Sequence, residues 1–473
     1  MSNLQAQALR LYFPRLLLGL TLGYVLFLQF YHLGELPIVQ WDESRLAVNA
    51  AEMCQSGNYL VSTFEGQADL YNTKPPFMIW LQVASIHLFG LDEFAIRFPS
   101  ALSGLLCIFL CGFIIYKHGK NIYAACFCMF ILACSKGFIQ LHGSITGDYD
   151  ALLTFWILAA FYQFYLLFIC EKISGSKWYF MLCLSLAVMS KSAAAMLVFP
   201  VFILTLLAFG QYRKMIQVGF YCLFATIPFI LFCILREQAS AGYLQAIMDN
   251  DFGGRFSKAL EGHTSEWYYY IVNLFDYRFN YLIWLLIPAL IYAIVKKDLL
   301  YRTCSIFFML FLIFISIPKT RIHWYDMPAL PLVALIITLF ITEVYSSIQE
   351  AFLKTTYLCA LCLLLMFPMI EKYKFITERK GLELDMGHYE LSQILRNQAQ
   401  NEQLIYLAGP YDAEFYFYTK SNPNVLRGHL KDIRTRDLLA FGNLYKDSIK
   451  HHYHYTLLDS TQNAQKIRIT GIK

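Results

Sequence analysis

Two adjacent carboxylates, Asp42 and Glu43, stand in the stretch "WDESRLAVNAAEM" directly after the first long apolar run of the chain. Apolar residues of this stretch recur every three to four positions and the charged residues take the other face, which predicts an amphipathic helix lying along a membrane surface. A carboxylate at a helix start can cap the helix and complement its dipole. It can equally serve as a general base or a metal ligand. The spacing leaves both roles open for Asp42.

A lysine follows at the entrance of the next predicted helix, in "NTKPPFMIWLQVASIHLF". Proline is favoured in the first turn of a helix, so the two prolines after Lys74 order the backbone there. A lysine held in this way is a suitable partner for a phosphate. The alternative is an interfacial lysine whose ammonium group reaches the lipid headgroups.

Two further acids, Asp148 and Asp150, precede an apolar run in "ITGDYDALLTFW". One of them can cap the helix that follows, and Asp148 is better placed for this. The two carboxylates of this pair could share a hard divalent cation with Asp42 and Glu43, and Glu43, Asp148 and Asp150 are the candidate metal ligands. Crowding of the acids could instead tune one of them into a general base.

Basic residues complete the set. Lys191 interrupts apolar sequence in "VMSKSAAAMLVFP" and needs a partner, either a carboxylate or a lipid phosphate. The stretch "IPKTRIHWYDMPALP" adds Lys319, Arg321 and Tyr325, and an arginine can hold a phosphate with two hydrogen bonds. His323 in the same stretch is more often a structural histidine than a ligand. Together these acids and bases suit chemistry on an anionic amphiphile.

The elements that position these residues are membrane spans. Of the 473 residues, 58% are hydrophobic and 15% charged, against about 25% charged in a typical soluble protein. Apolar runs long enough to cross a bilayer recur along the chain, so the sequence predicts a polytopic membrane protein. The first run, Leu16–Phe30, has no small-residue cleavage site after it and is expected to stay as an anchor. The predicted spans are 12–31, 96–116, 121–141, 150–170, 178–190, 193–210, 215–235, 281–295, 303–317, 327–346 and 355–370, where 178–190 and 193–210 could form one broken hairpin.

The basic residues of alternate short loops give the orientation. Every short loop on one side carries Lys or Arg, which by the positive-inside rule places the N-terminus in the cytoplasm. The other side holds two long loops, 32–95 and 236–280, and the acids and bases described above. We therefore expect the C-terminal tail, and any functional site formed by these acids and bases, to face outward.

The tail loses the membrane composition. We expect residues 1–370 to form the membrane domain and 371–473 a small soluble α/β domain, with a helix at "HYELSQILRNQ" and strands at "QLIYLAG" and "YHYTLLDS". The predicted fold class is thus an all-α polytopic membrane protein of about 11 transmembrane helices, with outward interfacial helices and this small domain. All but one of the 13 Cys lie in apolar segments, which indicates no disulfide framework. The modest net charge of +5 gives no reason to expect a nucleic-acid partner.

The order of these motifs resembles the type C glycosyltransferases, in particular the bacterial aminoarabinose lipid A transferase and protein O-mannosyltransferase family. The resemblance runs from about 32 to 345 and rests on "WDESRLAVNAAEMCQSGNYLV", "KPPFMIWLQ", "LFGLDEFAIRFPSAL", "GDYDALLTFW", "MSKSAAAMLVFP" and "KTRIHWYDMPALPLVALI". It implies a bundle of membrane helices that uses a polyprenyl-phosphate sugar as donor. The roles it implies are catalytic for Asp42, with Glu43 beside it, and for Asp150, and lipid-phosphate or donor binding for Arg45, Lys74, Lys191, Lys319, Arg321 and Tyr325.

Two departures from the family pattern are visible. The family often has Lys-Gly-Pro where this chain has Lys191-Ser192-Ala193. Aminoarabinose transferases commonly carry Glu at the position of Thr73, so a metal site carried over from them is in doubt; no cofactor is certain, and a divalent metal is possible.

The motifs and the resemblance together predict an integral-membrane glycosyltransferase of the bacterial inner membrane. It would move a sugar from a polyprenyl-phosphate donor to a lipid, glycan or protein acceptor at the outer face of that membrane and invert the anomeric carbon. A transporter or flippase of lipid-linked sugars is the alternative, although transporter sites usually lie at the bilayer midplane. A non-catalytic assembly protein with binding loops is a third reading.

Overall fold

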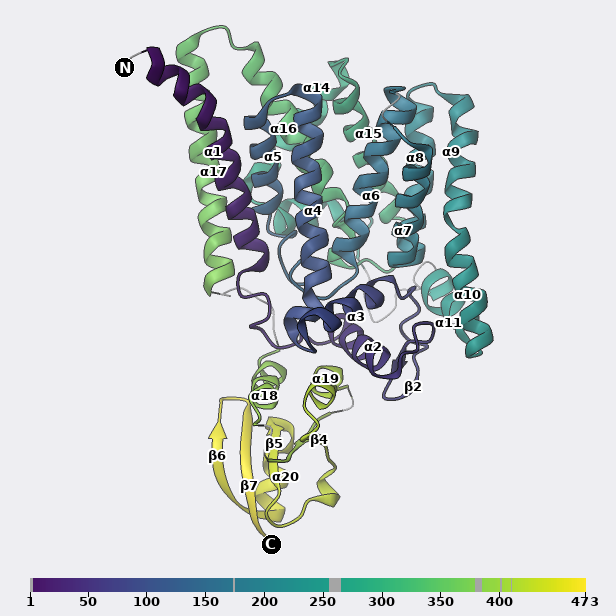
Figure 1. Cartoon of the computed structure of the whole chain (residues 1–473), viewed down its shortest axis with the longest axis vertical. Coiled ribbons are helices and arrows are strands. Elements are labelled where there is room, and N and C mark those ends of the chain that lie inside the picture. Colours follow the sequence, from purple (N-terminus) through teal and green to yellow (C-terminus); the bar gives the residue numbers. More distant parts are fainter. Residues whose placement is uncertain (1–2, 173–174, 255–264, 379–384, 400–401, 410) are drawn as a thin grey trace.

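A bundle of roughly parallel helices forms the larger part of the molecule (Figure 1). The computed structural model describes all residues except 1–2, 173–174, 255–264, 379–384, 400–401 and 410. The bundle contains α1 (Asn3–Phe30), α4 (Glu93–Gly119), α5 (Ile122–Ala133), α6 (Asp150–Phe164), α7 (Lys177–Met196), α8 (Val198–Ala208), α9 (Tyr212–Ala225), α10 (Ile227–Ala239), α14 (Leu286–Val295), α15 (Leu299–Ile315), α16 (Ala329–Ser347) and α17 (Ala351–Glu378).

Seven stretches of the described chain are long and apolar enough to cross a membrane, against about 11 predicted spans. They are Tyr12–Phe30, Glu93–Gly119, Asp150–Ile169, Lys177–Met196, Tyr212–Ala239, Ala329–Ser347 and Ala351–Glu378. Four other predicted spans are helical but shorter, at Ile122–Ala133, Val198–Ala208, Tyr281–Val295 and Leu299–Ile315. The multi-pass character is therefore confirmed. Four of the predicted spans are apolar helices of 10–17 residues, which is shorter than the roughly 20 residues that a full crossing needs.

The largest difference concerns the span predicted at 121–141. Its helix, α5, ends at Ala133, and residues 134–149 form an irregular segment in which Phe138 and Ile139 are fully buried. A helix of 12 residues is only about 18 Å long, which is less than the thickness of a bilayer core. Apolar composition marked this segment as membrane-embedded, but irregular backbone is possible there because surrounding protein groups satisfy its polar atoms.

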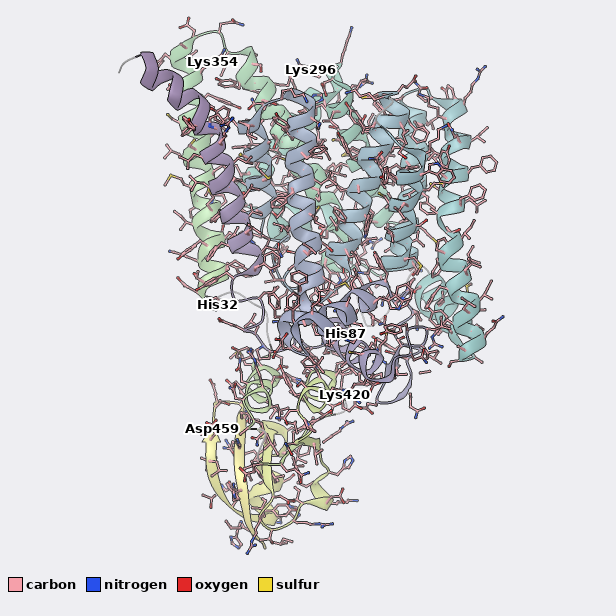
Figure 2. The ribbon with its side chains drawn as sticks, in the orientation of Figure 1. His32, His87, Lys296, Lys354, Lys420 and Asp459 are labelled. Atoms are coloured by element: carbon pink, nitrogen blue, oxygen red, sulfur yellow. The ribbon has the colours of Figure 1, made fainter. Side chains whose placement is uncertain are left out.

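The two ends of the bundle differ as the loop pattern predicts. Lys296 and Lys354 lie at one end, whereas His32 and His87 lie at the other, next to the long loops (Figure 2). At this second end α2 (Asp42–Ser56) and α3 (Phe77–Phe89) cross beneath the bundle, together with a small hairpin of β1 (Thr63–Phe64) and β2 (Gln67–Ala68) (Figure 1). Short helical segments lie in the second long loop: α11 (Tyr243–Ile247), the π-helical turn Met248–Gly254 and α13 (Tyr269–Asn273).

The C-terminal domain is a small α/β unit, as predicted. Its elements are α18 (Met386–Arg396), β3 (Leu404–Leu407), α19 (Ala413–Ser421), β4 (Val425–Arg427), β5 (Leu438–Gly442), α20 (Asn443–His452), β6 (Tyr453–Ser460) and β7 (Ala464–Ile472). The five strands have the order β4-β3-β5-β7-β6, with β3 parallel to β4 and β5, and β7 antiparallel to β5 and β6. Helix α17 of the bundle continues to Glu378, beyond residue 370.

This domain docks on α2 and on the start of α4, below the bundle (Figure 1). Tyr418 of α19 donates a hydrogen bond to Glu93 at 3.0 Å and accepts one from the backbone of Ile38 at 3.1 Å. Lys420 pairs with Glu52 at 3.1 Å. The contact therefore combines ion pairs with buried apolar packing, and it fixes the domain beside the N-terminus of α2.

Candidate active site

The acids singled out from the sequence meet at the N-termini of two helices. Asp42 is the first residue of α2 and Asp150 is the first residue of α6. Neither Asp42 nor Asp148 occupies the capping position, which Trp41 and Tyr149 hold without a capping side-chain hydrogen bond. The positive end of each helix dipole favours an ionised carboxylate there.

Asp150 forms a buried ion pair with Lys191. The Lys191 ammonium lies 2.7 and 2.8 Å from the two Asp150 oxygens and 4.7 Å from the centroid of the Tyr325 ring. Lys191 has non-helical backbone angles, φ −151° and ψ 63°, inside the otherwise regular α7. The structure thus brings together three residues predicted from separate motifs.

A pocket of about 770 Å³ empty volume adjoins this pair. Lys74, Asp150, Lys191 and Tyr325 line it together with apolar side chains of α15 and the backbone turn before α16. Two ammonium groups beside an apolar wall fit the phosphate and the first isoprenoid units of a lipid carrier. Lys74 and Lys191 therefore lie where a lipid phosphate could bind between them.

Asp251 also lines this pocket, and sequence reasoning missed it. It lies in the turn Met248–Gly254, is 6% exposed, and accepts a hydrogen bond of 2.8 Å from the Thr73 hydroxyl. The backbone carbonyl of Thr73 in turn accepts one of 2.8 Å from Tyr243. Asp251 thus places a carboxylate next to Thr73, the position at which aminoarabinose transferases commonly carry Glu. A local sequence pattern could not reveal this pair, because Thr73 and Asp251 are 178 positions apart.

Glu43 has a different environment from Asp42. Its side chain is fully buried, and Arg97 of α4 donates to both of its oxygens at 2.7 and 2.9 Å. The backbone amides of Val39 and Gly147 donate to the same oxygens at 2.7 and 2.8 Å. With four donors on its two oxygens, Glu43 anchors the loop before α2 to α4 and to the loop before α6.

Arg45 is likewise held within the protein. It forms two hydrogen bonds with Asp69, at 2.8 and 2.7 Å, and its guanidinium lies 4.4 Å from the ring centroid of Phe64 and 4.6 Å from that of Tyr71. Burial raises the pKa of Asp69, but the hydrogen bonds and the charge of Arg45, together with the hydrogen bonds from Asn49 and the Asn72 amide, outweigh it, so the pKa lies below its usual value. Arg45 therefore orders the loop after α2, and the pocket lining does not include it.

The basic pair before α16 also lies outside the pocket lining. Lys319 is exposed, and Arg321 donates to the backbone carbonyls of Ser316, at 2.8 Å, and of Ser265. Their neighbours Pro318 and Thr320 line the pocket instead. In this irregular turn, residues that line the pocket thus alternate with residues that do not, and a sequence pattern does not reveal which are which.

A second group of potential ligands lies beside Asp42. This group consists of Asp42, His142 and Asp148, each of which offers one potential ligand atom within 4.8 Å of the other two. The distance from His142 Nδ1 to Asp148 Oδ2 is 3.3 Å. One Asp148 oxygen accepts a hydrogen bond of 2.5 Å from Thr146, while the other is buried and has no hydrogen-bond donor among the described residues. Two carboxylates, one of them with an unsatisfied oxygen, and an imidazole fit a divalent cation.

This ligand set differs from the predicted one. Asp42 and Asp148 were among the carboxylates expected to share a cation, but the oxygens of Glu43 and Asp150 are bonded to Arg97 and Lys191, and His142 was not singled out. Burial lowers the pKa of His142, but the Asp148 carboxylate, with Asp42 and Asp150, more than offsets it and raises the pKa above the usual value. The one sequence signal for His142 was its place six residues before Asp148 in the same loop.

Part of the chain matches a known protein family, and longer parts resemble individual proteins. Residues 73–235 match the family described as dolichyl-phosphate-mannose-protein mannosyltransferase. An Aquifex aeolicus protein is 24% identical over 67% of this chain and 62% of its own length. The undecaprenyl phosphate-alpha-4-amino-4-deoxy-L-arabinose arabinosyl transferase of an Enterobacter species is 30% identical over 32% of this chain and 26% of its own. The chain thus spans less than two thirds of either relative.

The fold has a match over nearly its whole length. The crystal structure of ArnT from Cupriavidus metallidurans bound to undecaprenyl phosphate superposes with a TM-score of 0.70 at 14% identity, covering 95% of this chain and 97% of that one. The agreement extends over both the bundle and the C-terminal domain, so both parts predicted from the sequence belong to one known architecture.

Proposed function

We propose that this chain is a type C glycosyltransferase similar to the aminoarabinose lipid A transferases and protein O-mannosyltransferases, and that it transfers one sugar from a polyprenyl-phosphate carrier to an acceptor. The observation that supports this most directly is the pocket in which Lys74, Lys191 and Asp150 meet. Asp42 lies close enough to Lys191 and Asp150 to act on both electrostatically. A donor phosphate in the pocket would thus bring its sugar toward Asp42.

In the proposed reaction, an acceptor oxygen attacks the anomeric carbon of the donor sugar. The bond from that carbon to the lipid phosphate breaks, and the phosphate leaves with the electron pair. Lys74 and Lys191 stabilise the charge that the phosphate gains. The Lys191 ammonium uses at most two of its three N–H groups on Asp150, which leaves one for the phosphate.

Asp42 accepts the proton when the acceptor is a hydroxyl, and attack from the side opposite the phosphate inverts the anomeric carbon. An acceptor that is already an anionic phosphate needs no proton removal, and Asp42 then orients it. Asp150 holds Lys191 in place and so acts as a positioning residue. We assign Glu43 and Arg45 to the scaffold of the site because their polar atoms are bonded within the protein.

A divalent cation, when bound, would be held by Asp42, His142 and Asp148 and would supply positive charge next to the acceptor oxygen. The basic short loops support an orientation with the N-terminus in the cytoplasm and the site and the C-terminal domain outside.

Mass spectrometry of lipids and surface glycans tests the proposal. Cells that lack the gene are compared with cells that carry the wild-type gene, Asp42→Asn or Asp249→Asn, which changes an exposed acid. We expect one acceptor class to carry an added sugar mass with the wild type and Asp249→Asn but not with Asp42→Asn. A normally folded Asp42→Asn protein that still supports the modification would overturn the assignment.

A further inference from the structure

The segment 69–74, which ends at Lys74, is tied to the second long loop at the residue before the lysine. Thr73 is 1% exposed. Its carbonyl accepts a hydrogen bond from the Tyr243 hydroxyl, and its own hydroxyl donates to Asp251, each at 2.8 Å. The backbone next to Lys74 is therefore fixed from one side by buried polar contacts.

A chain of hydrogen bonds holds the same segment from the other side. The Tyr149 hydroxyl donates to Asn72 Oδ1 at 2.9 Å, and the Asn72 amide donates to Asn49 Oδ1 at 2.9 Å. The Asn49 amide in turn donates to the Asp69 carboxylate at 3.0 Å, and Asp69 is paired with Arg45. The first four of these residues are no more than 5% exposed. Because hydrogen bonds in such a chain polarise one another in a buried setting, the chain fixes the orientation of each side chain in it.

The aromatic ring at the start of this chain lies beside Lys74. The distance from Lys74 Nζ to the centroid of the Tyr149 ring is 6.0 Å, close to the limit of about 6 Å within which a ring face attracts a cation. A ring attracts an ammonium group without cancelling its charge, which a carboxylate in the same place would do. Since the Tyr149 hydroxyl is bonded to Asn72, the ring is fixed where it can support Lys74.

The start of α6 thus serves both ammonium groups of the pocket. Asp150, the first residue of the helix, pairs with Lys191, and its neighbour Tyr149 lies beside Lys74. Both lysines line the same pocket, and like charges repel each other. Without support, Lys74 would turn away from Lys191 toward solvent. Two adjacent residues therefore hold the two cations at one site.

We propose that Tyr149 and Asn72 are positioning residues for the lipid-phosphate donor. Their hydrogen bond keeps the aromatic ring beside Lys74 and so holds this ammonium at the pocket that it shares with Lys191 before the phosphate arrives. The inference rests on the proposed function and adds two residues to its donor site. A lysine that is ordered in advance loses less conformational entropy on binding, so loss of the support weakens donor binding and leaves the chemical step nearly unchanged.

The alternative is a purely structural role for the chain. Buried amides need hydrogen-bond partners, and Asn49 also donates to the Thr63 carbonyl at 2.7 Å, which joins α2 to β1. A structural role predicts the same effect on donor binding whether or not residue 74 is a lysine. A positioning role predicts that the effect disappears when Lys74 is replaced. The two roles are therefore distinguished by a double-mutant cycle.

Titration of labelled undecaprenyl phosphate into the full chain in lipid nanodiscs tests the proposal. Tyr149→Phe keeps the ring and removes its bond to Asn72, and we expect about fivefold weaker binding, as for the loss of one hydrogen bond. In Lys74→Met, where Lys191 keeps binding measurable, the same change should alter binding less than about twofold. An equal fold-change in both backgrounds would overturn the proposal. Tyr59→Phe, which removes an exposed hydroxyl, is the control and should bind as the wild type does.

Asn72→Ala gives an independent test because it breaks the chain at its middle. We expect it to weaken binding by about the same factor as Tyr149→Phe, and the double variant to bind no more weakly than Asn72→Ala alone. Fully additive effects would contradict action through one chain. With the acceptor class identified by mass spectrometry, each variant should raise KM for the donor and change kcat less than about twofold. A loss confined to kcat would exclude the positioning role.

The wild type and Lys74→Met separate this inference from the proposed function. If the wild type binds undecaprenyl phosphate and Lys74→Met weakens that binding, while Tyr149→Phe binds normally, the inference is wrong and the proposed function stands. If the wild type does not bind undecaprenyl phosphate, the proposed function fails and the inference fails with it.

Discussion

Arg97 and Glu43 form a fully buried pair, 54 positions apart in the chain, in which both carboxylate oxygens receive a guanidinium N–H. The other guanidinium bonds of Arg97 go to the backbone carbonyls of Leu33, Leu36 and Pro37, at 3.0, 2.7 and 2.7 Å. The pair thus fixes the path of the chain into α2, and with it the position of Asp42.

Glu43→Gln should therefore unfold more easily, because it leaves the Arg97 charge buried without its counter-ion. Loss of one partner of a buried pair costs about 3 to 5 kcal/mol. Thermal unfolding in detergent measures the effect, with Glu35→Gln at an exposed position as the control. Normal stability combined with complete loss of transfer would instead indicate a direct catalytic role for Glu43.

Lys74 and Lys319 were both predicted to bind the lipid phosphate, but only Lys74 lines the pocket. Lys74→Met should weaken binding of undecaprenyl phosphate by about tenfold or more, as expected for the loss of a charged hydrogen-bond donor. Lys319→Met should change it less than about twofold because exposed charges contribute little. Titration of labelled undecaprenyl phosphate into nanodiscs compares the two, and equal effects would contradict the geometry.

Asp251 should influence how the donor sugar is held. Asp251→Asn removes a negative charge from the pocket and keeps the hydrogen bond from Thr73. We expect a lower KM for the anionic donor with a smaller change in kcat, because a negative charge beside the phosphate is lost and Asp251 is not assigned to proton transfer. Asp249→Asn, in the same turn but exposed, is the matched control. A loss confined to kcat would place Asp251 in the chemical step.

A cation at Asp42, His142 and Asp148 can be measured without any assay of activity. Purified wild-type protein dialysed against Mn²⁺ or Zn²⁺ should retain metal by elemental analysis, and Asp148→Asn should retain much less. His118→Gln changes a histidine at the other end of the bundle and controls for unspecific binding. Equal retention by the wild type and Asp148→Asn would show that these three residues do not form a metal site.

The stability of the protein should depend on pH through His142. Its pKa is raised in the folded state, so the attraction between protonated His142 and Asp148 stabilises the fold fully below the unfolded pKa of about 6.5. This contribution is lost as the pH rises through the folded pKa. In the presence of a chelator, the difference in Tm between the wild type and His142→Gln should be largest near pH 6 and should shrink toward pH 9. A difference that grows with pH would contradict the assigned sign.

The sequence located most helices of the bundle and two strands of the C-terminal sheet, but it did not predict which side chains pair with one another. Apolar runs and caps located the helices, and "YHYTLLDS" coincides with β6. Residue type and family resemblance selected Asp42, Asp150, Lys74 and Lys191, three of which line one pocket. What the residues contact could not be predicted, because the partners of Glu43 and Lys191 come from other helices. Single-sequence patterns report periodicity along one element, whereas these pairs depend on how elements pack.

The irregular segment 134–149 shows the same limit. Its composition is that of a span, but its course is set by donors from distant elements. Gln29 donates to the Ser144 carbonyl at 3.0 Å, and the backbone amide of Gly137 donates to the Arg278 carbonyl at 2.9 Å. Lys372 donates to the Lys136 and Ile139 carbonyls at 3.3 and 3.2 Å.

These bonds have a consequence for biogenesis. Lys372 lies on α17, the last helix of the bundle to leave the ribosome, yet it holds the loop that carries His142 and leads to Asp148. The acids at the start of α2 and α6 are synthesised early, but their surroundings are complete only when α17 has been inserted. A chain that ends between α16 and α17 contains every assigned side chain of the pocket but lacks the Lys372 bonds to the loop, so the site is fully supported only after α17 has been inserted.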